Sequence, residues 1–145
     1  MLEKARWASL IPHQGTMCLL DIVVAFDATS LRARSESHRR ANNPLRDGGV
    51  LRALHLCEYG AQAMAVHGAL LAAAAGSAGK PGLLVALRAV KLYVARLDDL
   101  PDALDIHAEK LLDGGTSWQY AFSVDHAGRR LAEGRAAVVV SEEAR

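Results

Sequence analysis

The chain has 145 residues, 51% of them hydrophobic, and a formal net charge of +1. This length suits one domain, residues 1–145, with room for a core. The balanced charge argues against a nucleic-acid-binding surface. Cys18 and Cys57 lie far apart and form neither a Cys-x-x-Cys pair nor a metal-ligand spacing, so we expect buried, reduced thiols in a cytoplasmic protein without a metal site. The N-terminus has no signal-peptide core, and we expect no membrane-spanning segment.

The first third of the chain reads as helical turns, two strands and a loop. Residues 2–10 favour one or two helical turns, which Pro12 ends because the residue before a proline avoids the helical region. Met17–Phe26 and Leu31–Ser37 are apolar or alternate in polarity, which is typical of strands. Residues 38–52 are rich in turn formers and predict a long loop, and such loops are often functional.

Residues 53–75 form the one long helix-favouring run, dominated by alanine, leucine and methionine. The run is apolar on nearly every face, so we expect a helix buried on all sides. Glu58 stands out in it, because burying an unpaired carboxylate is costly. Gly60 and Gly68 would let the helix approach a neighbour closely.

Strand patterns fill the rest of the chain. The predicted strands are Gly82–Leu97, Ala103–Leu112, Ser117–Val124 and Leu131–Ser141. We therefore predict an α+β fold in which an antiparallel sheet of about six strands wraps around one helix. Such a sheet covers only one face of the helix, so we expect a dimer that covers the other face, joined through the long edge strand Gly82–Leu97.

Two stretches resemble a known family. Residues 10–21 read Leu-Ile-Pro-His-Gln-Gly-Thr-Met-Cys-Leu-Leu-Asp, similar to a Leu-Pro-His-Arg-x-Pro-Phe-Leu-Leu-Val-Asp opening. Residues 54–62 read Leu-His-Leu-Cys-Glu-Tyr-Gly-Ala-Gln, similar to a Val-Leu-x-x-Glu-Ala-x-Ala-Gln helix motif. Both motifs belong to the hotdog-fold (3R)-hydroxyacyl-[acyl carrier protein] dehydratases. The chain resembles most the small dehydratases of aryl-polyene and xanthomonadin-type pigment clusters.

The resemblance implies dehydration of 3-hydroxyacyl thioesters without a cofactor. This reaction needs a base for the proton at C2, an acid for the leaving hydroxyl, and a donor for the thioester oxygen. A helix N-terminus supplies the donor through its free N–H groups. The family has Pro-Gly at that place, where this chain has Arg52 and Ala53. Ala53 and Leu54 are therefore candidate substrate-binding residues through their backbone N–H groups.

Glu58 matches the catalytic acid of the helix motif. A carboxyl in apolar surroundings favours its protonated form, which suits an acid. At about 100° per residue, His55, Glu58 and Gln62 share one side of the helix, and Glu58 and Gln62 are spaced to hydrogen-bond. We expect His55 and Gln62 to line the substrate site, with a structurally satisfied carboxylate as the alternative for Glu58.

The base is harder to assign. The family's Gly-His-Phe-Pro segment is replaced here by residues 41–49, which contain no histidine. His13, in the first motif, is the first candidate, and a structural histidine is its alternative. His38 is the second candidate, with an exposed loop histidine as its alternative, and His55 is a third. His107 and His126 lie in a strand and a turn, where structural roles are the expectation.

Acyl carrier protein with a phosphopantetheine-linked acyl group is the partner that the resemblance implies. Scattered basic residues are candidates for its docking patch or are simply solvated: Arg34, Arg39, Arg40, Arg46, Arg88, Lys91 and Arg96. Two alternatives remain open. One is thioester hydrolysis with Glu58 activating water. The other is a non-catalytic subunit that completes a heterodimer with a second hotdog chain, instead of a homodimer or higher oligomer.

Overall fold

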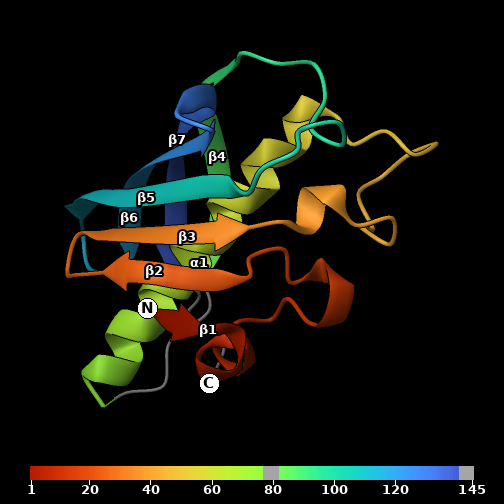
Figure 1. The fold of residues 1–145 in the computed structure, drawn as a ribbon. Coiled ribbons are helices and arrows are strands. Elements are labelled where there is room, and N and C mark those ends of the chain that lie inside the picture. The colour runs from red at the N-terminus through yellow and green to blue at the C-terminus, as the bar shows by residue number, and fades with distance from the viewer. Residues whose placement is uncertain (77–81, 141–145) are drawn as a thin grey trace.

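The protein folds as one long α-helix packed on a seven-stranded antiparallel sheet (Figure 1). The computed structural model describes the backbone of residues 1–76 and 82–140, and the side chains of these residues except 82–85 and 140. The helix α1 spans Leu56–Ala74 and is preceded by a 3₁₀ turn at Ala53–His55. The strands are β1 (Leu2–Glu3), β2 (Ile22–Phe26), β3 (Ser30–Ser35), β4 (Gly82–Leu92), β5 (Leu104–Asp113), β6 (Ser117–His126) and β7 (Arg129–Val140).

The strands lie in the order β1-β2-β3-β5-β6-β7-β4. The β6–β7 hairpin turns at Ala127 and Gly128, which both have positive φ angles, as a tight hairpin requires. β4 pairs with β7 on one side, and its other side carries no strand within the described part of the chain. It is therefore an edge strand, as the sequence predicted.

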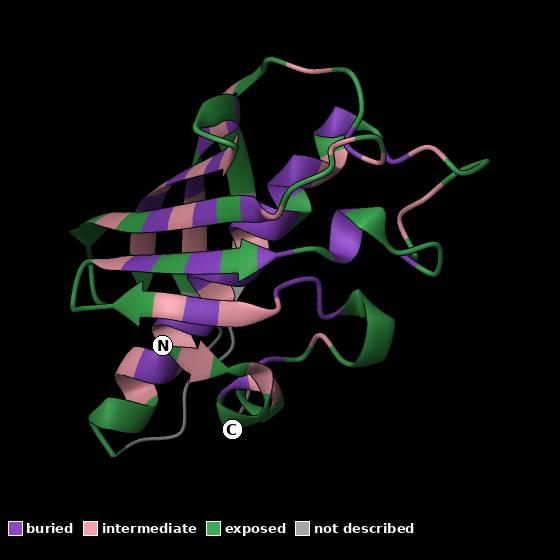
Figure 2. Cartoon of the chain, in the orientation of Figure 1, coloured by how far each residue is buried: buried purple, intermediate pink, exposed green. Residues whose placement is uncertain are grey.

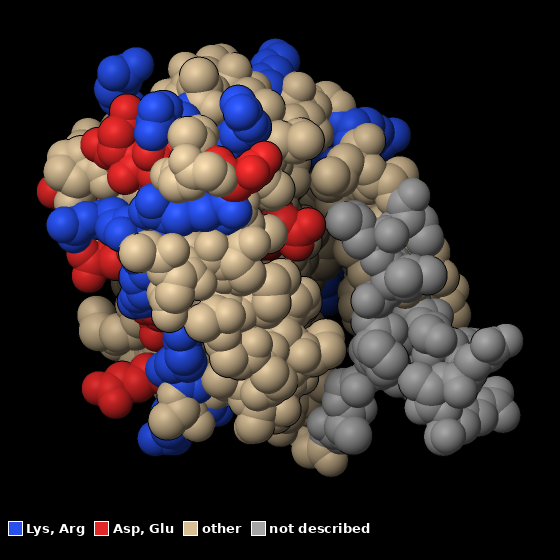
Figure 3. Space-filling view, turned by 90° about the vertical axis from the view of Figure 1, so that its right-hand side faces the viewer, with Lys and Arg blue, Asp and Glu red and all other residues tan. Residues whose placement is uncertain are grey.

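One face of the sheet packs on α1 and the other faces solvent. Along β3 and β5, buried and exposed residues alternate (Figure 2), because side chains of a strand point to opposite faces in turn. The buried positions meet the buried residues of α1 in a single core. Figure 3 shows charged side chains gathered toward its left side, where the outer face of the sheet lies.

Gly60 allows α1 to lie close to the sheet. A Cβ atom at Gly60 would stand 2.5 Å from Cδ2 of Phe122 on β6. The ring of Phe122 also fills the space above Gly134 of β7, where a Cβ would be 2.9 Å from it. Gly68 makes no such approach, because its nearest neighbour is Trp118 at 3.8 Å. The close approach expected of the two glycines therefore holds for Gly60 alone.

The structure corrects three expectations about the elements. The sheet has seven strands instead of about six, because Leu2–Glu3 adds a short one. The strand predicted over Met17–Phe26 begins only at Ile22, since the preceding segment is held by side chains instead of a neighbouring strand. The strand predicted over Gly82–Leu97 ends at Leu92, and Ser141, at the end of the last predicted strand, lies outside the described residues.

The helix is also less enclosed than its composition suggested. The sheet buries one side, whereas Glu58 is exposed and Ala61, Ala65 and Ala69 are only partly buried. The apolar face beyond the sheet is thus open in the single chain. Within the described residues, no helix combines the length and the hydropathy needed to cross a bilayer.

The two helix glycines give a matched stability test. We expect Gly60→Ala to lower the free energy of unfolding by about 1–3 kcal/mol, because its methyl group overlaps Phe122. Gly68→Ala should leave it unchanged or raise it by up to about 1 kcal/mol, because alanine is the better helix former. Urea denaturation of both variants measures the difference, and equal stabilities would contradict the close packing at Gly60.

Candidate active site

The start of α1 is held by a short backbone pairing with the segment that follows β4. The N–H of Ala53 donates to the carbonyl of Ala95 at 3.1 Å, and Leu97 N–H donates to Leu51 O at 2.8 Å. The Asp98 carboxylate accepts the N–H of Leu51 at 2.9 Å. The guanidinium of Arg96 also bonds this carboxylate and holds the pKa of Asp98 far below its usual range. These contacts place the helix N-terminus.

The free donor at the helix N-terminus is the amide of Leu54. The Ala53 amide, the first candidate for binding the thioester oxygen, is already bonded to Ala95. Among the described residues, no acceptor takes the N–H of Leu54. The Leu54 side chain is 64% exposed, so this amide lies at the surface.

Glu58 lies one helical turn after Leu54 and is exposed. Residues four apart share a helix face, so the exposed side chains of Leu54 and Glu58 lie on the same open side of α1. No hydrogen bond or ion pair engages Glu58 within the described residues. The expected buried carboxylate is therefore not present in the single chain, and the alternative of a structurally satisfied carboxylate has no bonding partner there either.

The side chain of Gln62 points to the first motif, residues 10–21, and not to the side chain of Glu58. Its side chain is fully buried, and its Oε1 accepts the N–H of Leu19 at 2.8 Å while its Nε2 donates to the carbonyl of Met17 at 2.6 Å. The predicted bond between Glu58 and Gln62 is therefore not formed. The physical reason is that the segment around Leu19 covers one side of α1 and leaves the side of Glu58 open. The two motifs of the sequence are thus joined directly through Gln62.

A second buried network holds the residue next to Glu58. The hydroxyl of Tyr59 is 2.7 Å from the Ser37 hydroxyl and accepts the side-chain N–H of Asn43 at 3.3 Å. The Ser37 hydroxyl lies 2.9 Å from that of Ser35, which donates to the carbonyl of Leu19. Burial raises the pKa of Tyr59, so it remains a neutral hydroxyl. Sequence reasoning missed this network, since the sequence pattern predicts Ser35 and Ser37 as strand residues and Asn43 as a loop residue.

His13 lies on the segment that Gln62 holds. His13 is half-buried as a whole, and its Nδ1 is buried without a hydrogen-bond partner in the described part of the chain. No hydrogen bond joins it to Glu58 within these residues. A buried polar atom without a hydrogen bond lowers the stability of the fold, so a hydrogen-bond partner for this nitrogen would be stabilising.

His38 is not the exposed loop histidine that was its alternative. It is fully buried, and its Nε2 donates to the carbonyl of Leu100 at 3.0 Å, because a carbonyl can only accept. Its Nδ1 is buried and unpaired within the described residues. Burial lowers the pKa of His38, so the ring is neutral. His55, the third candidate, is half-buried at the start of the helix.

His67 is buried in the middle of α1 and is fully satisfied. Its Nε2 donates to the carbonyl of Asp27 at 2.8 Å, so its Nδ1 accepts the hydroxyl of Tyr120, also at 2.8 Å. Burial lowers the pKa of His67 and raises that of Tyr120. His67 therefore ties the helix to β6 and to the β2–β3 turn, and it takes no part in the site at Glu58.

The basic residues do not gather into one patch. Arg34 lies on the outer face of β3 beside Asp105, whereas Arg39 and Arg40 lie near the loop and pair with Glu36 and Asp21.

Within the described residues, no group of three or more His, Cys, Asp or Glu side chains is arranged to hold a metal ion.

Comparison with solved structures assigns the fold class first. A chain of the dehydratase heterocomplex ApeI:P from Xenorhabdus doucetiae superposes with a TM-score of 0.85 at 22% identity, covering 99% of this chain and 93% of that one. Zebra fish thioesterase superfamily member 2 gives a TM-score of 0.65 at 16% identity over 95% of both chains. A hypothetical thioesterase with coenzyme A from Streptococcus pneumoniae gives 0.60 at 16% identity, over 83% of this chain and 84% of that one. These are hotdog folds, and the predicted fold class is confirmed.

The family follows from the sequence. The model of the ApeP-like family, described as ApeP dehydratase, matches residues 5–145. This chain therefore belongs to the ApeP-like dehydratase family, which confirms the resemblance seen in the two motifs. No curated protein matches the chain.

Glu58 and Gln62 should respond differently to substitution. Gln62→Leu removes two hydrogen bonds and leaves the buried N–H of Leu19 and the partly buried carbonyl of Met17 without this partner, so we expect a loss of about 2–4 kcal/mol in the free energy of unfolding. Glu58→Gln alters an exposed side chain without partners and should change it by no more than about 0.5 kcal/mol. Urea denaturation checks both, and an equally large loss at Glu58 would make its role structural.

The two buried histidines make stability depend on pH. His38 and His67 both have pKa values lowered from the usual 6.5. The unfolded chain therefore binds more protons than the folded chain below about pH 6.5. We expect the free energy of unfolding to fall as pH drops from 7.5 to 5.5, with a smaller slope in His67→Gln. Denaturant titrations at several pH values measure it, and a flat profile would contradict this.

Proposed function

We propose that this chain is a hotdog dehydratase that acts on (3R)-hydroxyacyl thioesters of acyl carrier protein and forms trans-2-enoyl thioesters. The observation that supports it most is that the exposed Glu58 follows the unbonded backbone N–H of Leu54 by one helical turn at the start of α1. One group can protonate a leaving hydroxyl, and the other can polarise a thioester carbonyl. Both reside at the helix N-terminus, whose dipole stabilises negative charge.

The reaction then divides between these groups and a base. The base takes a proton from C2, and the Leu54 amide stabilises the charge that develops on the thioester oxygen. Glu58 gives its proton to the hydroxyl at C3, the C3–O bond breaks, and water leaves as the double bond forms between C2 and C3. Proton transfer from the base to the Glu58 carboxylate restores both groups.

His13 is our candidate for the base. It lies in the first motif, and Gln62 fixes that segment to the same helix that carries Glu58. Its buried Nδ1 has no hydrogen-bond partner among the described residues, which supports a role outside the fold of the single chain. His38 is less suited to the role, because its Nε2 is bound to the Leu100 carbonyl and the ring is fully enclosed.

A second hotdog subunit is the partner that the open surfaces favour. The exposed face of α1 and the free edge of β4 are both uncovered in the single chain. A partner packed there would exclude water from Glu58 and give the carboxyl the apolar setting that an acid needs. The similar dehydratase ApeI:P is a heterocomplex, which favours a different chain over a second copy as this partner. The carrier protein would then deliver its acyl group to a site completed by both subunits.

Assay of enoyl-thioester formation tests the assignment. The chain is measured alone and together with a second hotdog dehydratase subunit, using a 3-hydroxyacyl carrier protein. We expect Glu58→Gln and His13→Ala each to lower kcat/KM by about 10²-fold, the usual scale of acid–base catalysis. Glu58→Asp should retain part of the activity, since it keeps the carboxyl.

Three outcomes would count against the proposal. Unchanged kcat/KM in both variants would remove Glu58 and His13 from catalysis. Release of free thiol without enoyl product would make the protein a thioesterase. If the partner subunit is fully active without this chain, or together with the Glu58→Gln variant of this chain, then this chain has only a structural role. Because Glu58→Gln should leave stability unchanged, a lost activity cannot be ascribed to unfolding.

A further inference from the structure

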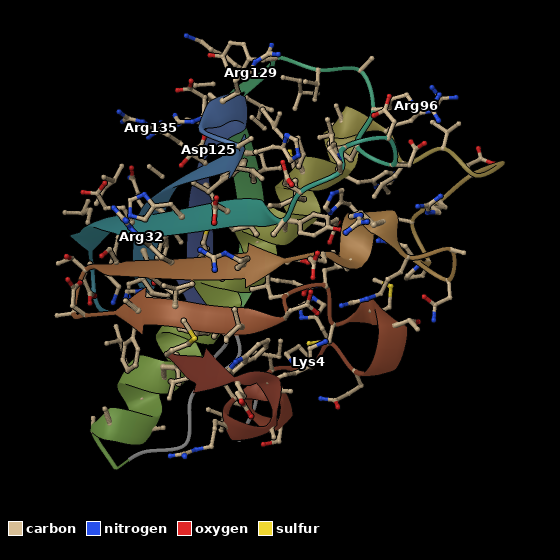
Figure 4. The ribbon with its side chains drawn as sticks, in the orientation of Figure 1. Lys4, Arg32, Arg96, Asp125, Arg129 and Arg135 are labelled. Atoms are coloured by element: carbon tan, nitrogen blue, oxygen red, sulfur yellow. The ribbon has the colours of Figure 1, made fainter. Side chains whose placement is uncertain are left out.

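The outer face of the sheet, turned away from α1, carries a hollow of about 450 Å³. Its floor has small residues on β6, Ala121 and Ser123, and its walls include Lys91 of β4 and Arg135 of β7. Figure 4 shows Arg135 and Arg32 on this outer side. The hollow lies away from the Glu58 face, and its size falls within the range of small-molecule sites.

Two arginines face each other directly across β4 and β7, and one of them, Arg135, lines the hollow. Arg88 of β4 and Arg135 of β7 are cross-strand neighbours, and like charges opposite each other destabilise a sheet. Arg135 has no hydrogen bond or ion pair within the described residues, and Arg88 donates only to the side-chain oxygen of Gln119 at 3.0 Å. The single chain therefore retains an unfavourable pair that an anion would relieve.

Lys91 adds a third cation without a carboxylate partner. It lies across from Glu133, but Glu133 already accepts the Tyr93 hydroxyl at 2.7 Å and lies 3.8 Å from Arg130. No ion pair of Lys91 occurs within 4 Å among the described residues. Lys91 and Arg135 are thus cations on the β4–β7 side of the hollow that lack an ion-pair partner among the described residues, and the Glu133 carboxylate lines the same side.

The backbone of β4 is strained at this same place. Ala89 has a φ of 53°, and the pairing of β4 with β7 shifts between Arg88 and Lys91. A residue other than glycine is strained in this region, because its Cβ crowds the backbone. Such bulges re-aim the side chains beside them and are enriched near functional sites. The bulge lies between Arg88 and Lys91 in the sequence of β4.

We infer that this hollow is a binding site for a phosphate ester, whose phosphate group is held by Arg135 and Lys91 of its lining, with Arg88 beside Arg135 on the neighbouring strand. Glu109 lines the opposite wall on β5, two strands from Arg135, which is about 10 Å across the sheet. Its carboxylate suits a hydroxyl or ammonium group at the other end of the ligand. Phosphate chemistry of this kind occurs in free metabolites and in the phosphopantetheine arm.

Binding and thermal stability of the full chain test the inference together. The probes are inorganic pyrophosphate and 4′-phosphopantetheine, titrated by calorimetry at constant ionic strength. We expect saturable binding that weakens about 10-fold in Arg135→Gln, because a charge-assisted bond to phosphate is lost. The control Arg129→Gln removes the same charge from the β6–β7 turn, outside the lining of the hollow, and should bind as wild type. Tighter binding of 4′-phosphopantetheine than of pyrophosphate would assign the pantetheine arm, and the reverse a free phosphate ligand.

The ligand-free protein supplies a second readout. Relief of the like-charge pair should raise the Tm of Arg135→Gln by about 1–3 °C, while pyrophosphate should raise the Tm of wild type only. A mere structural role for Arg135 predicts a lower Tm. Absence of saturable binding to either probe, or equal weakening in Arg135→Gln and Arg129→Gln, would overturn the inference. Neither readout depends on dehydratase activity, so the proposed function can fail separately.

Discussion

The amide of Gln62 is the interaction on which the arrangement of the candidate site depends. It holds the backbone of Met17 and Leu19 against α1, and the carbonyl of Leu19 is held in turn by the Ser35 hydroxyl of β3. The first motif is thereby fixed to both the helix and the sheet. A side chain that bonds two buried backbone groups cannot be exchanged for an apolar one without leaving both unpaired. This constraint explains why a polar residue occupies a fully buried place in an apolar helix.

Polar residues that lie close together in the sequence of α1 have different surroundings in the structure. Glu58 and Gln62 differ by one turn, yet one is exposed and the other completely buried. Gln62 serves the fold, and Glu58 makes no contact that the fold requires. A carboxyl that bonds no group of its own fold is available to bind a ligand. The unbonded backbone N–H of Leu54 is available in the same way. The separation also leaves the Glu58 side of α1 open in the single chain.

Much of the architecture could be predicted from local sequence patterns. Alternation along β3 and β5, the alanine-rich helix and the edge position of β4 followed from periodicity and chain order. The two family motifs identified Glu58 as the residue to examine. By contrast, the strand predicted from Met17 failed, because apolar residues in Cys18–Leu20 are buried by side-chain bonds from Gln62 and Ser35. Single-sequence patterns do not reveal contacts made across 43 residues of chain. The engagement of the Ala53 amide by Ala95 escaped prediction for the same reason.

The left-handed Ala89 also limits how β4 can be extended by another chain. An added strand can hydrogen-bond regularly along only part of this edge, because the pairing of β4 already shifts between Leu84 and Ala86, and the bulge after Arg88 breaks the spacing of donors and acceptors again. A continuous intermolecular ladder must therefore end there or carry a matching irregularity of its own. One backbone angle in this way restricts the register of any joined sheet, and it favours a cognate subunit over indiscriminate strand addition.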